Sequence, residues 1–235
     1  MDLSIIIPVF NEAQKIPKDI LEAQEYLLKH SLKGEIIVSD DGSGDNTKAV
    51  VKDLQKEHKN LILLENPHRG KGGTVKAGMV HAKGDIMLFI DSGSCIPYSD
   101  VDLGVKLVQE GHSDIAHASR FLPESKIDKP KSLFRRLLSR AFRIAIPLYM
   151  GIYGKYSDTQ CGLKIYRKGA GHKIYKDCFT NGFMIDIETI IRAEKHQFTI
   201  KEFPIHWYAD PDSRLTASKT FMNMLRELRR IKREI

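Results

Sequence analysis

The sequence predicts an α/β fold, namely a doubly wound, mostly parallel sheet with helices on both of its faces. Through the first hundred residues, short apolar runs alternate with segments whose apolar residues recur at helical spacing. Such alternation is typical of parallel sheets crossed by helices. The chain has 235 residues, of which 42% are hydrophobic and 29% charged, and this size and composition fit one folded domain.

The expected elements follow one another in chain order. The run LSIIIPV at 3–9 is β-branched, too short for a helix and interrupted by Pro8, so it predicts a strand. Next comes a helix at 16–30, with Ile16, Ile20 and Leu27 on one face. Further strands are expected at 35–40, 61–65 and 85–91, and further helices at 46–57, capped by Asp45 or Asn46, and at 74–82.

The residues after the first four strands are polar, acidic or rich in glycine. They are PVFNE at 8–12, DDGSGDNT at 40–47, NPHRGKGGTV at 66–75 and DSGS at 91–94. Each loop alone is explained equally well as a turn. However, parallel strands end at a common edge, where sheets of this class bind their ligands. Four such loops at that edge therefore predict a ligand site.

The net charge of +7 is unevenly distributed. Segments 129–157 and 214–235 together carry +12, which leaves about −5 on the rest of the chain. A basic stripe on a mildly acidic body indicates a polyanionic partner, such as a membrane surface, phosphates or nucleic acid. Nucleic acid ranks lowest, because the chain has no nucleic-acid motif and no aromatic residues interleaved as stacking platforms.

Segment 129–155 combines basic residues with apolar residues at helical spacing, from Leu133 to Ala145. This pattern is typical of a helix that lies in a membrane interface, although a basic helix packed on the sheet is an alternative. We expect residues 1–219 to form the main domain, including this segment. Residues 220–235 are expected to form a basic helix that binds the membrane or a partner, or a frayed tail.

The number and spacing of the cysteines, together with the lack of targeting patterns, indicate in which cellular compartment the protein works. Cys95, Cys161 and Cys178 show neither a disulfide framework nor the spacing of a zinc site, which favours a reducing compartment. The sequence has no signal-peptide pattern and no stretch of 18 apolar residues. We therefore expect a peripheral protein on the cytoplasmic side of a membrane, or otherwise a cytoplasmic one.

These motifs resemble those of the GT-A-fold glycosyltransferases of family 2, in which the first loop reads P-x-Y/F-N-E and the second D-D-G-S. Two further motifs resemble those of the dolichyl-phosphate β-glucosyltransferases within that family. RGKGGTV at 69–75 matches R-G-K-G-G-x-V, and DTQCGLK at 158–164 matches D-T-Q-C-G-F-K with one conservative change. The resemblance runs from about residue 3 to residue 219. The first two motifs are shared by a large superfamily, whereas the last two are long enough to be specific.

The resemblance implies an inverting glycosyltransferase that moves a hexose, glucose from UDP-glucose, to a polyprenyl (dolichyl-type) phosphate at a membrane surface. Another nucleotide sugar or a glycan acceptor is an alternative within the same family. A binding protein for nucleotide sugars with a degraded metal site is an alternative outside the enzymes.

The nucleotide sugar is expected to contact the first three loops. Hydrogen-bond acceptors suit its base and ribose, an apolar wall suits the base, and cations beside open backbone N–H groups suit its phosphates. One of the paired aspartates is expected to read uracil, and the sequence does not say which; for Phe10, core packing is an alternative. The expected residues are Pro8, Phe10, Glu12, Asp40, Asp41, Arg69, Lys71 and Gly72.

A divalent metal, Mg²⁺ or Mn²⁺, is implied by the family at the fourth loop, where a D-x-D motif holds the diphosphate through hard carboxylate oxygens. Here the motif reads Asp91-Ser92-Gly93, so the second carboxylate is missing. Asp91 is the expected metal ligand and also contacts the donor, and Ser94 or Cys95 is a possible additional ligand. The departure opens the hypothesis of weak donor binding or slow turnover.

The reaction centre is expected around the phrase that contains Asp158, Gln160 and Gly162, with Cys161 as a small packing residue. Asp186 is expected to face the sugar, although Asp186 and Glu188 are explained equally well as charges at a helix N-terminus. A phosphate nucleophile is ionised near neutral pH and needs positive charge rather than a strong base. The expected catalytic residues are Asp91, Arg120, Asp158, Gln160 and Asp186, and the expected acceptor-phosphate residues are Arg120, Arg214, Ser218 and Lys219.

Overall fold

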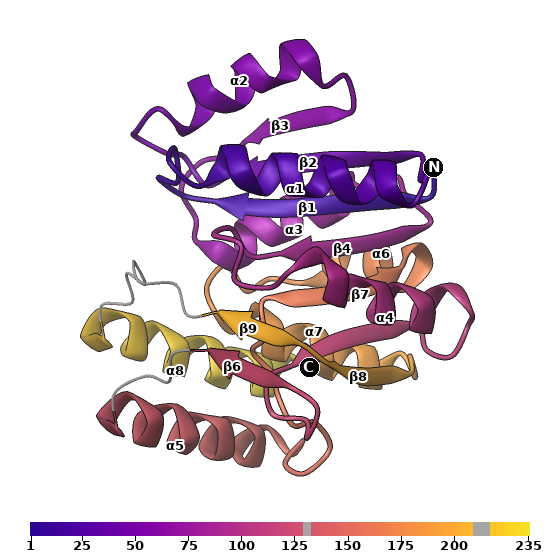
Figure 1. The fold of residues 1–235 in the computed structure, drawn as a ribbon. Coiled ribbons are helices and arrows are strands. Elements are labelled where there is room, and N and C mark those ends of the chain that lie inside the picture. The colour runs from indigo at the N-terminus through magenta and orange to yellow at the C-terminus, as the bar shows by residue number, and fades with distance from the viewer. Residues whose placement is uncertain (129–132, 209–216) are drawn as a thin grey trace.

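The structure, a computed structural model, describes residues 1–128, 133–208 and 217–235, and the side chains of these ranges except 133–139 and 217–221. Its centre is a seven-stranded sheet of order β3-β2-β1-β4-β7-β5-β8 (Figure 1). The strands are β1 (Leu3–Val9), β2 (Gly34–Asp40), β3 (Leu61–Glu65), β4 (Ile86–Ile90), β5 (Ile115–Ser119), β7 (Leu163–Arg167) and β8 (Ile200–Pro204).

The strands are parallel except β7. Strand β1 pairs in parallel with β2 and β4, β2 with β3, and β5 with β8. Strand β7 lies between β4 and β5 and runs antiparallel to both. The predicted α/β fold with a mostly parallel sheet is therefore confirmed. Because β7 runs in the opposite direction to β4, the start of β7 lies beside the carboxyl end of β4. The 158–162 loop, which precedes β7, therefore lies at the same edge of the sheet as the loop after β4.

Helices cover both faces of the sheet (Figure 1). Alternate residues of β1 separate the two cores, since Ile5 and Ile7 belong to one core and Ile6 to the other. Burial on both faces explains why the strands are apolar throughout. One face carries α1 (Ile16–Lys29), α2 (Thr47–Glu57) and α4 (Tyr98–Gln109), and the other carries α3 (Lys71–His81), α6 (Lys168–Asp177) and α7 (Ile185–Lys195).

The expected boundaries of α3 were wrong at its start. The sequence predicts a helix from residue 74, whereas α3 begins at Lys71, directly after Gly70. Two glycines in its first turn weaken the helical pattern in the sequence. Gly70 has a φ of +102°, a conformation that glycine adopts without strain. The basic loop and the first turn of α3 are therefore continuous.

A peripheral layer completes the molecule. The short strands β6 (Lys126–Asp128) and β9 (His206–Tyr208) pair in parallel, and the helices α5 (Leu133–Met150) and α8 (Ala217–Glu234) lie side by side (Figure 1). Lys232 of α8 donates a hydrogen bond of 2.9 Å to the Tyr149 carbonyl of α5. A third apolar core joins these helices to α7 through Ile146, Ile152, Met184, Ile187, Ile190, Leu228 and Ile231.

Helix α5 is only partly covered by this third core. Ile146 is buried, whereas Leu148, two residues later, is 64% exposed. The alternative prediction for 129–155 was a basic helix whose apolar face packs on the sheet. Part of this segment does use its apolar face for packing, but it packs on α7 and α8. None of the described helices has the length and apolar character needed to cross a membrane.

Candidate active site

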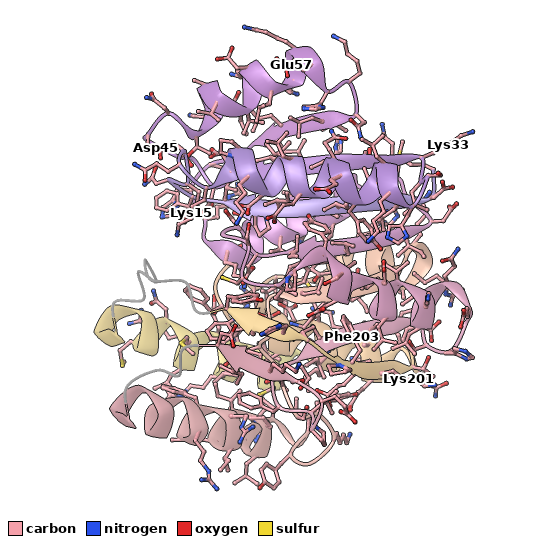
Figure 2. All side chains as sticks on the ribbon, viewed as in Figure 1. Lys15, Lys33, Asp45, Glu57, Lys201 and Phe203 are labelled. Atoms are coloured by element: carbon pink, nitrogen blue, oxygen red, sulfur yellow. The ribbon has the colours of Figure 1, made fainter. Side chains whose placement is uncertain are left out.

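Asn11 joins the first two loops at the carboxyl edge of the sheet. Its side-chain oxygen accepts hydrogen bonds from the N–H groups of Gly44 (2.8 Å) and Asp45 (3.3 Å), and its own N–H donates to Ser43 Oγ at 2.9 Å. Figure 2 shows Asp45 and Lys15 at this end of the sheet and Lys33 at the opposite end. Asn11 of the first motif therefore organises the loop after β2.

Asp40 and Asp41 are both engaged in holding loops. Asp40 is fully buried; its Oδ2 accepts the Ser43 N–H at 2.9 Å, and its Oδ1 has no partner among the described residues. Asp41 accepts the N–H groups of Arg69 (2.8 Å) and Gly70 (3.1 Å). The carboxylate of Asp41 thus fixes the start of the basic loop. A base contact from either residue stays a prediction.

Phe10 is on the surface at this edge, so core packing is excluded for it. Its ring is 40% exposed and stacks on His68, with ring centroids 4.5 Å apart and planes at 22°. His68 Nδ1 also lies 2.9 Å from Asp41 Oδ2. The two rings lie face to face, and a base could extend this stack on the outer face of either ring. Sequence reasoning missed His68, although it lies in the quoted loop NPHRGKGGTV.

Pro8 and Glu12 lie on either side of Phe10 in the chain. Pro8 is half-buried within β1. The Glu12 N–H donates to Thr47 Oγ1 at 2.9 Å, and its carboxylate lies 3.6 Å from Lys15 Nζ. Arg69 is exposed beside the same loop. The structure therefore brings the expected base, ribose and phosphate residues to one edge.

The glycines of the basic loop allow a close approach to the 179–184 segment. A Cβ atom on Gly72 would lie 2.6 Å from the Gly182 carbonyl oxygen and 2.7 Å from that of Thr180. The Gly73 N–H donates to the Asn181 carbonyl at 3.1 Å. Gly72 is therefore required for backbone packing at this point, which is a structural role that the sequence did not indicate.

Lys71 and Asp91 form an ion pair at the centre of the edge. Lys71 Nζ lies 2.7 Å from Asp91 Oδ2. Burial lowers the pKa of Lys71, but the negative charges of Asp91 and Asp186 outweigh burial and raise it. The expected phosphate-binding cation and the expected metal ligand are thus bonded to each other.

Asp186 is paired as well. It forms a buried ion pair with Lys164 of β7, whose Nζ also donates to the Cys161 carbonyl at 3.1 Å. Glu188 is fully buried, and its carboxylate accepts the N–H groups of Phe179 (3.0 Å) and Thr180 (2.8 Å). Both side chains therefore do more than supply charge at the start of α7. Sequence reasoning missed Lys164, although it closes the quoted phrase DTQCGLK.

The 158–162 loop packs directly against Asp91. The Asp91 N–H donates to the Gly162 carbonyl at 2.8 Å, and a Cβ atom on Gly162 would overlap the Asp91 carboxylate. Cys161 is buried, and burial raises the pKa of its thiol to about 12. These contacts agree with a packing role for Cys161 and explain the glycine beside it.

Arg120 and Asp158 form a bidentate ion pair. Arg120 Nε lies 2.7 Å from Asp158 Oδ2, and its terminal nitrogen lies 3.0 Å from Oδ1. Burial raises the pKa of Asp158, but the guanidinium outweighs burial and holds this pKa below its usual value. The guanidinium also lies 5.6 Å from the ring centroids of both Phe121 and Trp207. Its position is therefore closely fixed.

Gln160 belongs to the same loop, and its N–H lies 3.3 Å from Asp158 Oδ1. Arg214, expected at the acceptor phosphate, lies outside the described residues, as do the side chains of Ser218 and Lys219. Their acceptor role stays a prediction.

The side chains and backbone of the 92–94 loop are bonded to Asp19. Ser92 Oγ donates to Asp19 Oδ2 at 2.7 Å, and Ser94 Oγ donates to Asp19 Oδ1 at 3.0 Å. Gly93 supplies no side chain, and its N–H also donates to Asp19, at 3.0 Å. Asp91 Oδ2 is already bonded to Lys71.

Within residues 1–128, 133–208 and 217–235, no group of three or more His, Cys, Asp or Glu side chains is arranged to hold a metal ion. Asp91 remains available as a single carboxylate. The ligands of this chain therefore do not fit the carboxylate pair expected of a divalent metal site. Asp19, which the sequence reading did not single out, holds this loop through hydrogen bonds to Ser92, Gly93 and Ser94.

A cavity of about 560 Å³ lies between α1 and residues 93–99. Its wall includes Glu22, Tyr26, Gly93 and Tyr98 but none of Lys71, Asp91 and Arg120. The cavity is therefore separate from the cluster of ion pairs.

Comparison with known proteins agrees with these motifs. The model of the family described as Glycosyl transferase family 2 matches residues 4–173. A dolichyl-phosphate beta-glucosyltransferase of Trichomonas vaginalis is 30% identical over 226 residues, which cover 92% of this chain and 68% of that protein. The dolichyl-phosphate beta-glucosyltransferase of Drosophila melanogaster is 32% identical over 243 residues, which cover 97% of this chain and 73% of that protein.

A similar solved structure is glucosyl-3-phosphoglycerate synthase from Mycobacterium tuberculosis in complex with Mn²⁺, UDP and phosphoglyceric acid. It is 17% identical, and the alignment has a TM-score of 0.69 and covers 97% of this chain and 78% of that one. At this identity the likeness shows the fold alone, which is the GT-A fold. The family model, in contrast, matches most of the chain and includes the four loops at the carboxyl edge. The chain therefore belongs to glycosyl transferase family 2 and is a glycosyltransferase.

Proposed function

We propose that this enzyme transfers glucose from UDP-glucose to a polyprenyl phosphate of the dolichyl type at a membrane surface, with inversion at the anomeric carbon. The observation that carries the proposal is the likeness to proteins named dolichyl-phosphate beta-glucosyltransferase along more than nine tenths of the chain. The geometry of the carboxyl edge supports it in three respects: the donor site, the acceptor site and the neighbouring surface.

The donor side has a surface for a base and a cation for a diphosphate. The Phe10–His68 stack offers a face on which uracil rests, and Asp41 lies beside it. Lys71 lies further along the same loop, where its ammonium attracts the phosphates of the donor. These groups hold the nucleotide so that the sugar points toward Asp91 and the 158–162 loop.

The acceptor side has a fixed guanidinium. Arg120 is held by Asp158 and by the rings of Phe121 and Trp207, so it keeps one orientation while it binds a phosphate. An oxygen of the acceptor phosphate attacks the anomeric carbon and forms the new C–O bond. The bond to UDP breaks on the opposite face, and UDP leaves with the electron pair. The nucleophile is already ionised, so positioning and positive charge carry the catalysis.

The surface beside Arg120 suits a lipid. Arg143 of α5 stacks on Phe121, with its guanidinium 3.9 Å from the ring centroid, so α5 adjoins the residue after Arg120. Helix α5 and the turn after it expose Ile144, Leu148, Tyr149 and Tyr153. Exposed apolar and aromatic side chains beside basic ones are the features of a helix that binds a membrane interface. A lipid phosphate in that interface therefore has a short path to Arg120.

The test is transfer by the purified protein from a panel of nucleotide sugars to a short-chain polyprenyl phosphate. We expect UDP-glucose to be the preferred donor and the product to carry a β-linked glucose, read from the anomeric coupling in its NMR spectrum. Preference for another donor would overturn the assignment of glucose, and transfer to glycans alone would overturn the lipid acceptor. UDP binding without transfer to any acceptor would favour a binding protein.

A further inference from the structure

The loop that carries a second carboxylate in the family is used differently in this chain. Gly93 occupies that position with a φ of +103°, which an aspartate adopts only with strain. The N–H groups of Gly93 and Ser94 both donate to the carboxylate of Asp19, at 3.0 Å each. Hydrogen bonds to α1 therefore fix the loop, and its backbone donors and hydroxyl groups are already engaged.

The positive charge at this place comes from Lys71. Its ammonium lies 2.7 Å from Asp91 Oδ2, on the carboxylate that the family uses for the metal. A metal ion on the same oxygen would stand beside an ammonium and be repelled by it.

The ammonium is also held in place. Lys71 lies in the first turn of α3, and the glycines on both sides of it pack against the carbonyl groups of residues 180–182. Its Nζ lies 6.0 Å from the centroid of the Phe89 ring. An ammonium has three N–H donors, and the bond to Asp91 uses one of them. The other two suit the oxygens of a diphosphate, and the Asp91 side chain beside them is 40% exposed.

We infer that the Lys71 ammonium takes the place of a divalent cation at the donor diphosphate, so that donor binding and transfer by this enzyme require no metal. The inference rests on the proposed function for the identity of the donor. Lys71 stabilises the negative charge that develops on the leaving UDP, and Asp91 positions Lys71. This role would separate the chain from the solved neighbour that holds Mn²⁺ and UDP together.

The first experiment needs no substitution. UDP affinity is measured by calorimetry on the wild-type protein in excess EDTA and again with Mn²⁺ or Mg²⁺, and transfer from UDP-glucose is measured under the same conditions. We expect both quantities to agree within about threefold. UDP affinity or transfer that is lost in EDTA and restored by Mn²⁺ would overturn the inference.

The second experiment tests Lys71 itself. Lys71→Met keeps the length of the side chain and removes its charge, and a charge-assisted hydrogen bond of this kind corresponds to about 10- to 100-fold in UDP affinity. We expect that loss without rescue by Mn²⁺, and partial retention in Lys71→Arg. Lys83→Met, at an exposed lysine after α3, is the matched control and should bind UDP normally. Normal UDP binding and transfer by Lys71→Met would overturn the inference.

The two proposals fail in different ways. If UDP affinity depends on Mn²⁺, the proposed role of Lys71 is wrong, but the proposal of a glucosyltransferase still stands. Absence of UDP binding under every condition removes both proposals.

Discussion

At the residue scale, the centre of the site is a set of opposite charges that meet across different elements. Lys71 of α3 meets Asp91 after β4, Arg120 after β5 meets Asp158, and Lys164 of β7 meets Asp186 of α7. The Lys164–Asp186 pair is buried and Arg120–Asp158 nearly so, whereas the Asp91 side chain is 40% exposed. Loss of one partner from either of the two buried pairs would leave a buried charge without compensation, so the geometry of the site depends most on these pairs.

Gly162 permits one of these contacts. In Gly162→Ala, the added Cβ would overlap the Asp91 carboxylate and displace it from Lys71. We expect kcat/KM for transfer to fall by about 100-fold or more, since a small misplacement near the reacting groups has effects of this size. Kinetic assays with UDP-glucose and circular dichroism at rising temperature measure this effect.

Gly169→Ala is the matched control, because a Cβ atom there would contact nothing within 4 Å. This variant should keep full activity and be slightly more stable, since alanine is the better helix former in α6. If Gly162→Ala is as active as Gly169→Ala, the close packing of the 158–162 loop on Asp91 does not matter for transfer.

His117 predicts a pH dependence of stability. Its two ring nitrogens are buried in β5 without a partner among the described residues, and burial, helped by the charge of Lys164, holds its pKa well below 6.5. In the unfolded chain the imidazole takes up a proton below about pH 6.5, whereas the folded protein does not. Falling pH therefore favours the unfolded state, and between pH 7 and pH 5.5 the free energy of unfolding should drop by about 1 kcal/mol on this account.

The variant His117→Leu should lack this contribution and should be no less stable at pH 7, because it removes two buried polar atoms without partners. Urea unfolding of both proteins at the two pH values isolates the effect, since every other titrating group is shared. Parallel pH profiles for the two proteins would contradict the assignment.

At the scale of elements, a carboxylate of α8 helps to hold the 179–184 segment. Glu227 accepts the N–H groups of Gly182 (2.7 Å) and Met184 (3.2 Å), while Glu188 holds Phe179 and Thr180 from the other side. The 179–184 segment held in this way presents its carbonyl groups to the glycines around Lys71. The basic C-terminal helix is therefore connected to the proposed donor site through one short segment.

Replacement of Glu227 tests this connection. Glu227→Gln keeps the shape but leaves one partly buried N–H group without an acceptor, so we expect a loss of about 1 kcal/mol of stability. UDP affinity should fall as well, because the 179–184 segment positions Lys71. Chemical unfolding and calorimetry with UDP measure the two effects. Glu234→Gln, on the same helix at an exposed position, should change neither by a comparable amount.

The sequence predicted the elements whose pattern is local. The first three strands and α1 follow from runs and spacings within a few residues, and they are observed within one residue of the expected bounds. Contacts between distant residues were not predictable in this way. Lys164 and Asp186 are 22 positions apart, and Asp19 and Ser92 are 73 apart. Neither the antiparallel direction of β7 nor the two backbone bonds of Glu227 leaves a local signal.

The polarity of the loops predicted the candidate site, and the roles expected of its residues stay predictions. The open backbone N–H groups around Gly72 indicated phosphate binding, and the resemblance implied metal binding for Asp91. In the structure, Gly72 packs against residues 180–182 and Asp91 is bonded to Lys71. Glycine and aspartate serve many purposes in loops, and the neighbours that select one purpose come from elsewhere in the chain.

At the scale of the whole molecule, basic and apolar groups face the solvent along α5, next to the acceptor side. Arg140 is exposed there, beyond the apolar residues that pack on α7 and α8. The proposed membrane contact predicts that Arg140→Glu weakens binding to anionic vesicles. A cation near such a surface contributes about 1 kcal/mol, so its reversal corresponds to a loss of roughly 10- to 30-fold in affinity.

Lys59→Glu makes the same change of charge after α2, which lies at the opposite end of the molecule from α5 (Figure 1). This control should bind vesicles like the wild type, and added salt should weaken the binding of both. Vesicle sedimentation at low and moderate salt measures the effect. An equal loss for the two variants would point to net charge alone and count against α5 as the contact.

The antiparallel strand β7 has a consequence for the growing chain. Strands β1 to β4 are adjacent in the sheet and are synthesised first. In the finished sheet β7 lies between β4 and β5, but β7 is synthesised only after α4, β5, β6 and α5. The first half of the sheet therefore emerges from the ribosome with the edge of β4 unpaired. Such an edge is a template for pairing with other chains. Residues 163–167 thus close the sheet, and a ribosome that stalls before them leaves a nascent chain prone to aggregation.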